Sequence, residues 1–129
     1  MRDIKFRAWD KTINYMDYRV RFSHFEDGIE VLDSWSSWRE LKKDEYELMQ
    51  YTGLKDKKGV EIYEGDILIE TKSKDTFEVK YGWFEDVSVS TFLQMGVYLY
   101  DGYETRPFYR LNYKVIGNIW EDGDLIDSE

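Results

Sequence analysis

The chain of 129 residues contains no cysteine, one histidine and one proline. The absence of cysteine excludes disulfide bonds and thiolate metal sites, and it fits a reducing compartment such as the cytoplasm. The single histidine, His24, leaves too few nitrogen ligands for an ordinary zinc site. The sequence also lacks a Walker motif, a Gly-x-Gly-x-x-Gly motif and a calcium-loop motif. We therefore expect no cofactor and no metal.

The sequence also lacks a long apolar segment. Residues 1–5 are charged, unlike a signal peptide, and the most apolar stretch, residues 87–99, is too short and too polar to span a membrane. We expect a soluble, cytoplasmic protein without a membrane partner. The length is typical of one domain, here residues 1–129, with a possible N-terminal lobe at 1–52 and a possible C-terminal β lobe at 60–121.

Basic residues are outnumbered by acidic residues. There are 27 acidic and 18 basic side chains, which gives a net charge of −9. This charge opposes binding to a phosphate backbone, so nucleic acid is an unlikely partner. The acidic excess is concentrated at the C-terminus, in Glu121, Asp122, Asp124, Asp127 and Glu129. We interpret this run as a solvated tail.

Aromatic residues are abundant, at 18% of the chain. They argue against disorder and favour β-sheets. A small core has little room for so many, and Tyr and Trp are enriched at interfaces. Strand alternation places some apolar side chains on outward faces; the candidates are Trp9, Met16, Tyr18, Trp83, Tyr98 and Tyr100. We therefore expect self-association, with a host or phage protein as a further possible partner.

The residue pattern predicts a mainly β fold with minor α: compact antiparallel sheets, with a possible small SH3-like barrel in the C-terminal half. Period-two alternation predicts an N-terminal hairpin from residues 4–9 and 15–20, and a paired hairpin from residues 67–70 and 77–81. Further strands are expected at 29–32, 47–51, 87–100 with a break near Gly96, and 113–120 with a bulge at Gly117. A short helix is expected within 33–50, because Ser34, Ser36 or Ser37 could cap it and residues 38, 41 and 46 could form one apolar stripe.

Three segments form a longer pattern. Residues 4–10 read IKFRAWD, residues 48–59 read LMQYTGLKDKKG and continue at 61–67 as EIYEGDI, and residues 115–121 read VIGNIWE. In this order they resemble the YopX family of phage and prophage proteins. The resemblance implies a mainly β fold with some helix and a phage or prophage origin. It carries over no catalytic or binding residue, and segments 20–46 and 82–112 lie outside it.

The motif residues have a structural and a functional interpretation. They are Trp9, Asp10, Gln50, Tyr51, Thr52, Gly53, Leu54, Tyr63, Glu64, Gly65, Asp66, Gly117 and Asn118. Gln50 and Tyr51 could contact a ligand, or the segment could end a strand with Gly53 at positive φ. Glu64 and Asp66 could bind a metal or act as acid and base, or Gly65-Asp66 could form a turn. Trp9 could donate to Asp10, or the pair could end a strand. The structural interpretation is favoured in each case.

No catalytic constellation is evident. His24 lies in Ser23-His24-Phe25-Glu26, and we interpret it as an ordinary surface or packed residue. We therefore expect a non-enzymatic protein-binding or assembly module. The alternative is a nucleic-acid-binding small barrel, in which aromatic rings stack on bases and Lys55, Lys57 and Lys58 contact phosphate.

Overall fold

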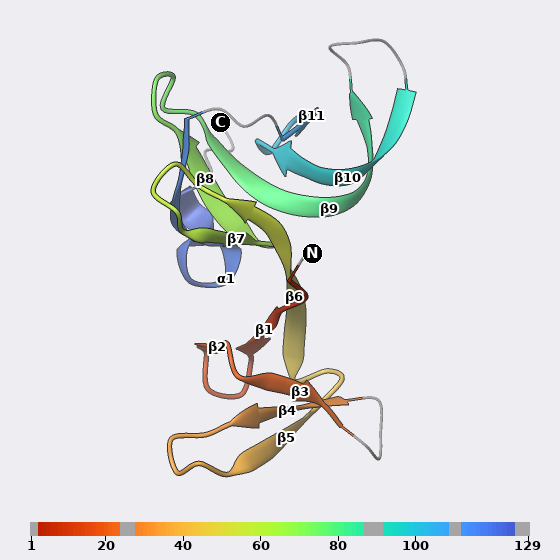
Figure 1. Cartoon of the computed structure of the whole chain (residues 1–129), viewed down its shortest axis with the longest axis vertical. Helices are drawn as coiled ribbons and strands as arrows, with labels where there is room; N and C mark the ends of the chain where they lie inside the picture. Colours follow the sequence, from red (N-terminus) through yellow and green to blue (C-terminus); the bar gives the residue numbers. More distant parts are fainter. Residues whose placement is uncertain (1–2, 24–27, 87–91, 109–111, 126–129) are drawn as a thin grey trace. The chain divides into compact units, whose positions relative to one another are not determined.

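The computed structural model describes residues 3–23, 28–86, 92–108 and 112–125. The described residues form twelve strands, a four-residue helix and a short 3-10 helix (Figure 1). The predicted mainly β fold with minor α is therefore confirmed. The chain divides into two units, Met1–Tyr51 and Thr52–Glu129. None of the helices in the described part of the chain combines the length and the apolar composition needed to cross a bilayer.

The first unit contains two small antiparallel sheets. Its elements are β1 (Phe6–Asp10), β2 (Tyr15–Asp17), β3 (Val20–Phe22), β4 (Gly28–Leu32), β5 (Trp38–Lys42) and the first part of β6 (Tyr46–Lys55). Strand β1 lies between β2 and β6, and the second sheet has the order β3-β4-β5. Trp9 lies opposite Met16 across the β1–β2 pair, which confirms the predicted N-terminal hairpin. The core of this unit is formed by Ala8, Ile29, Val31 and Leu41.

The helix predicted within residues 33–50 is wrong. Residues 38–42 form strand β5, and residues 46–50 belong to strand β6. Leu41 is buried opposite Ile29, whereas Trp38 and Glu40 are exposed on the other face of the sheet. The segment therefore has a period of two, and pairing with the apolar strand β4 outweighed the weak helical stripe.

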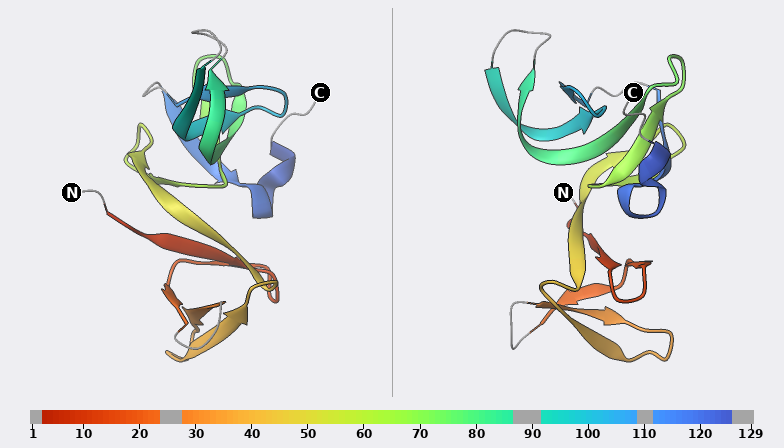
Figure 2. Two further views of the ribbon diagram at one scale, coloured as in Figure 1. Left: turned by 90° about the vertical axis from the view of Figure 1, so that its right-hand side faces the viewer. Right: turned by 180° about the vertical axis from the view of Figure 1, so that it is seen from behind.

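The second unit contains a five-stranded antiparallel sheet that curls into a half-barrel (Figures 1 and 2). Its elements after β6 are β7 (Glu61–Tyr63), β8 (Asp66–Glu70), β9 (Thr76–Asp86), β10 (Phe92–Tyr100), β11 (Thr105–Pro107), β12 (Tyr113–Asn118), α1 (Ile119–Asp122) and η1 (Gly123–Leu125). The strand order is β11-β10-β9-β8-β12. Strand β8 pairs with β9 as predicted. The core is formed by Ile62, Leu68, Phe77, Val79, Leu99 and Tyr113.

The sequence predicted a break in the strand near Gly96. Strand β10 is instead continuous there, and it bends. Gly96 lies opposite Gly82 in an unbroken β9–β10 register, with φ values of 156° for Gly96 and 146° for Gly82. The rings of Phe84 and Tyr98 stack with centroids 5.0 Å apart, although their cross-strand pairs are four residues apart along β9. Two facing glycines thus let the hairpin fold over itself, as glycine kinks do in curved sheets.

The chain after β12 corrects two further predictions. The last strand ends at Asn118 rather than at residue 120, because Asn118 caps a helix. Glu121 and Asp122 belong to that helix, so they are not part of a solvated tail. The carboxylate of Asp122 accepts a hydrogen bond from the Asn118 amide at 3.3 Å, which closes this short turn onto the strand.

Candidate interaction surface

The segment Tyr63–Asp66 forms a tight turn between β7 and β8. Gly65 has a φ of 84°, and the Asp66 carboxylate accepts a hydrogen bond from the Tyr63 amide at 2.7 Å. The predicted Gly65-Asp66 turn is therefore confirmed. The amide of Gly65 donates to the carbonyl of Val79, and its carbonyl accepts from the amide of Ile119. This one turn thereby fastens β9 and the start of α1 to the β7–β8 connection. Glu64 beside it is half-buried.

The segment Gln50–Leu54 lies along β6. Gly53 has a φ of 85°, as predicted. The buried Thr52 hydroxyl donates to the carbonyl of Ile62 at 2.7 Å and accepts from the amide of Leu54 at 3.1 Å. Tyr51 is only 4% exposed, with the Lys5 ammonium 5.2 Å from its ring centroid. Gln50 is half-buried opposite Phe6, and Leu54 packs on the core of the second unit.

Asp56 was not singled out by the sequence, yet it organises the loop after β6. Its carboxylate accepts hydrogen bonds from the amides of Lys58 (2.8 Å), Val60 (2.9 Å) and Val115 (3.0 Å). Burial raises the pKa of Asp56, but these amides and the Lys58 charge outweigh burial and lower the pKa below its ordinary value. The available signal was an Asp three residues before Gly59, the pattern of an Asx-stabilised turn.

Gly117 and Asn118 connect β12 to α1. The pairing register shifts between Val115 and Gly117, which confirms the predicted bulge. A Cβ atom on Gly117 would lie 2.5 Å from the Asp122 carboxylate, so this bulge accommodates only glycine without movement of Asp122. The Asn118 side chain accepts hydrogen bonds from the amides of Trp120 and Glu121, both at 3.0 Å.

Trp9 and Asp10 end strand β1. The Asp10 carboxylate is buried, accepts from the amide and the hydroxyl of Thr12, and pairs with Arg39 of β5. Burial raises the pKa of Asp10, and the bonds from Thr12 and Arg39 lower it to below its ordinary value. The predicted strand-terminating turn is confirmed. The tie to Arg39 was missed, because no local pattern relates residues 29 positions apart.

The expected exposure of six apolar side chains holds only in part. Tyr18 and Trp83 are exposed. Trp9 and Met16 are each only 7% exposed, so their predicted exposure is wrong: the β1–β2 face that carries them is covered within the fold. Tyr98 and Tyr100 are half-buried, because the hairpin bend brings Phe84 onto Tyr98 and the Tyr100 hydroxyl donates to the carbonyl of Gly102 at 2.9 Å.

The first unit has an open pocket of about 340 Å³ beside the β4–β5 turn. Most of its surface is apolar, with charged groups at a few points. The pocket is lined by Ile13, Tyr15, Asp17, Arg19, Val31, Leu32, Asp33, Ser34 and Arg39. Ile13 and Tyr15 are exposed, whereas Val31 is buried. The Arg19 guanidinium lies 3.8 Å from the Asp17 carboxylate and is half-exposed. These features suit the binding of a ligand that presents an apolar side chain to the pocket and a carboxylate to Arg19.

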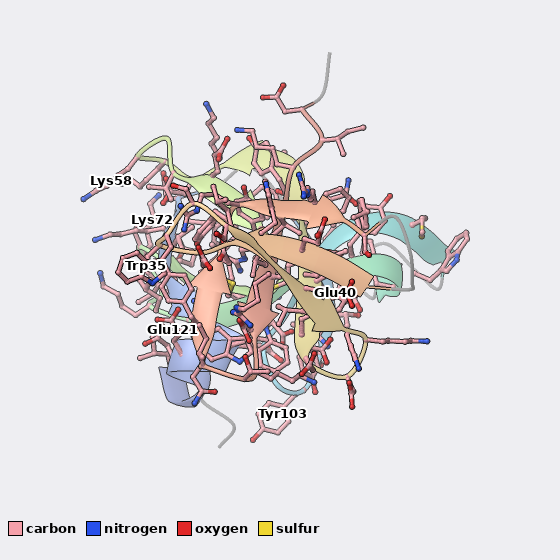
Figure 3. The ribbon with its side chains drawn as sticks, turned by 90° about the horizontal axis from the view of Figure 1, so that it is seen from below. Trp35, Glu40, Lys58, Lys72, Tyr103 and Glu121 are labelled. Carbon is pink, nitrogen blue, oxygen red and sulfur yellow. The ribbon has the colours of Figure 1, made fainter. Side chains whose placement is uncertain are left out.

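Trp35 projects from the turn that forms one wall of this pocket (Figure 3). Its side chain is 87% exposed. The turn itself is fixed, because the Asp33 carboxylate accepts hydrogen bonds from the amides of Trp35 and Ser37, both at 2.9 Å. We call Trp35 and the adjoining pocket the Trp35 surface. The sequence does not predict this surface, because Ser34, Ser36 and Ser37 around Trp35 suggest helix caps.

A second pocket, of about 370 Å³, lies in the second unit next to the family motif. It is more polar than the first pocket. Its lining residues are Gly53, Leu54, Lys55, Asp56, Lys57, Phe108 and Tyr113. The rings of Phe108 and Tyr113 lie 5.3 Å apart, and both lysines are exposed. Lysines beside aromatic rings are the combination that the nucleic-acid interpretation requires.

The remaining candidates supply no further site. His24 lies outside the described residues. In the part of the chain that the structure describes, no three acidic or histidine side chains converge as metal ligands would, and Glu64 with Asp66 is no exception.

Comparisons with known proteins extend the resemblance seen in the sequence. The model of the YopX protein family matches residues 5–127, nearly the whole chain. The crystal structure of protein EF1440 from Enterococcus faecalis is similar at 27% identity with a TM-score of 0.67, over 98% of this chain and 100% of that one. No curated protein matches the sequence.

Proposed function

This chain belongs to the YopX family, and we propose that it is a non-enzymatic protein-binding module whose partner contacts the Trp35 surface. One observation carries the proposal: a tryptophan is 87% exposed on a turn that two amide–carboxylate hydrogen bonds hold in place. Exposing an indole to water is unfavourable, whereas tryptophan is among the residues that contribute most to protein–protein binding. A fixed turn also reduces the entropy lost when a partner binds.

The neighbouring pocket defines the kind of partner. An aliphatic or aromatic side chain fits between Ile13, Tyr15 and Leu32. The half-exposed Arg19 can bind a carboxylate on the partner, because its own pairing with Asp17 is loose, at 3.8 Å. The partner is therefore a phage or host protein that presents an apolar side chain next to an acidic one, in the cytoplasm of a bacterial host.

Photo-crosslinking tests this proposal. A photoreactive amino acid replaces Ser34, which is exposed and lines the pocket, and the variant is produced in infected or lysogenic cells. The matched control carries the same amino acid at Lys43, an exposed position in another turn of the same unit. We expect a discrete protein adduct from position 34 and none from position 43. Equal adducts from both positions, or none from either, would refute the proposal.

The alternative function is binding of single-stranded nucleic acid through the second pocket. Lys55 and Lys57 beside the rings of Phe108 and Tyr113 combine phosphate-binding charge with a stacking surface. The net charge of −9 works against it. We rank it below protein binding for this reason.

A further inference from the structure

A fixed pair of aromatic rings lines the second pocket. Tyr113 is only 4% exposed and meets Phe77 of the core edge-on, with ring centroids 6.1 Å apart. The ring of Phe108 lies against Tyr113 at an interplanar angle of 34° and packs on the same core, yet Phe108 is only half-buried. Part of the Phe108 ring therefore remains available to a ligand, and little side-chain freedom is lost when the ligand binds.

Two exposed lysines line the pocket beside these rings. Lys55 ends β6, and Lys57 follows in the loop, where its amide donates to the carbonyl of Tyr113 at 3.1 Å. The carboxylate of Asp56 between them accepts hydrogen bonds from three backbone amides, which hold this loop in place. Among the residues that the structure describes, neither lysine has a carboxylate within ion-pair distance. Two positively charged side chains thus stand on a well-held backbone.

The size and the charge of the pocket limit the ligand. Its volume of about 370 Å³ lies at the lower end of the range for small-molecule pockets. Two lysines balance about two negative charges, which is the charge of one phosphate monoester near neutral pH. A strand would bring a further charge with every nucleotide to a unit that already contains 16 acidic and 9 basic residues. The pocket therefore suits one phosphate group and one ring rather than a strand.

We propose that the second pocket binds a small molecule that joins a planar ring to a phosphate group, as a nucleoside monophosphate does. The phosphate contacts the ammonium groups of Lys55 and Lys57, and the ring stacks on Phe108. The family-pattern segment 48–59, which protein binding at the Trp35 surface leaves without a role, supplies residues 53–57 to this pocket. The proposal concerns the second unit alone and does not depend on the Trp35 surface.

Titration followed by amide chemical shifts in NMR spectra tests the proposal, with AMP, adenosine and ribose 5-phosphate as probes. AMP should bind with a dissociation constant on the order of 100 µM, because two charges and one ring contribute. The shifts that AMP causes should concentrate at residues 53–57 and at Tyr113. Adenosine lacks the phosphate and ribose 5-phosphate lacks the base, so each should bind at least about tenfold more weakly than AMP.

Substitutions separate the two halves of the site, and the same spectra show that each variant is folded. Lys57→Ala should weaken binding of AMP and of ribose 5-phosphate about fivefold and leave adenosine unchanged, because it removes only a phosphate contact. Phe108→Leu keeps an apolar side chain but loses the flat ring, so it should weaken AMP about fivefold and leave ribose 5-phosphate unchanged. Lys72→Ala is the matched control: it removes one positive charge from an exposed turn of the same unit, outside the pocket lining, and should change no affinity.

Four results would overturn the proposal. One is the absence of localised shifts with AMP at about 5 mM. Another is undiminished AMP binding by a folded Phe108→Leu variant. Equal weakening by Lys72→Ala and Lys57→Ala is the third, since general charge rather than the pocket would then hold the phosphate. The last is an oligoadenylate of about ten nucleotides that binds more than about tenfold more tightly than AMP, because a strand would then be the ligand.

Discussion

Short acidic side chains order several turns of this chain. The carboxylates of Asp33, Asp56, Asp66 and Asp101 each accept at least one hydrogen bond from a backbone amide within four residues. Each bond satisfies a backbone donor that the turn would otherwise leave to solvent. Part of the acidic excess therefore has a structural role.

Gly65 combines a positive φ with backbone hydrogen bonds to Val79 and Ile119. We predict that Gly65→Val lowers the free energy of unfolding by about 1–3 kcal/mol, because a β-branched residue is strained at a φ of 84°. Gly123→Ala is the control: Gly123 has a helical φ of −56° and open space around it, so alanine should be neutral or slightly stabilising. Urea denaturation measures both. Equal stability of Gly65→Val and wild type would contradict the prediction.

Asp56 should make stability depend on pH in the acid range. The pKa of Asp56 is lowered in the folded chain. Its contribution to the free energy of unfolding is therefore fully present above a pH of about 4, and it is lost as the pH falls through the folded-state pKa. Asp56→Asn should therefore lower stability at neutral pH and flatten its decline between about pH 5 and pH 2. Urea denaturation across this range measures both effects.

Glu78 provides the opposite case for comparison. Burial raises the pKa of Glu78 despite the attraction of Lys80. The contribution of Glu78 to the free energy of unfolding is therefore lost as the pH rises through its folded-state pKa. Glu78→Gln should therefore make stability rise more steeply with pH above about 4.5. If Asp56→Asn and Glu78→Gln change the pH profile in the same direction, the assigned pKa directions are wrong.

Among the elements, those predicted correctly have local signals. Neighbouring residues alone predict the alternation over residues 4–9 and 67–70 and the turn at Gly65-Asp66. The structure confirms these predictions. The helix predicted within 33–50 is wrong. Trp38 and Leu41 fit a helical stripe in the sequence, but in the structure they lie on a strand that pairs with β4. The Trp35 surface was missed for the same reason: its pocket joins residues 13–19 with residues 31–39, which only the fold brings together.

The bend of the β9–β10 hairpin gives a prediction at this scale. Gly96→Val should be destabilising by about 1–3 kcal/mol, because valine at a φ of 156° opposite Gly82 is strained. The stack of Phe84 on Tyr98 should also loosen, and the near-ultraviolet circular dichroism of these rings should fall. A fully stable variant with an unchanged aromatic spectrum would show that the bend does not depend on glycine.

Over the whole molecule, the acidic charge is unevenly distributed. The first unit holds 11 acidic and 9 basic residues, so it is close to neutral, whereas the second unit carries most of the net charge of −9. The near-neutral unit also carries the Trp35 surface. An acidic partner meets less like charge within the first unit itself than within the second unit itself, which supports the Trp35 surface as the partner-binding surface.

The same distribution predicts weak nucleic-acid binding. At about 150 mM salt, gel-shift assays with single- and double-stranded DNA and RNA should show no sub-micromolar affinity, because the lysines of the second pocket lie in the more acidic unit. Lys57→Glu should make no measurable difference in such an assay. Sub-micromolar binding that Lys57→Glu abolishes would favour the alternative function.

The most direct test of protein binding at the Trp35 surface is quantitative affinity capture from infected or lysogenic cells with three baits: wild type, Trp35→Ala and Trp83→Ala. Both substitutions remove an exposed indole, one from each unit, so non-specific adhesion should fall similarly. The account predicts at least one protein that wild type and Trp83→Ala retain equally and that Trp35→Ala loses by tenfold or more. Equal recovery of every captured protein by Trp35→Ala and wild type would contradict it.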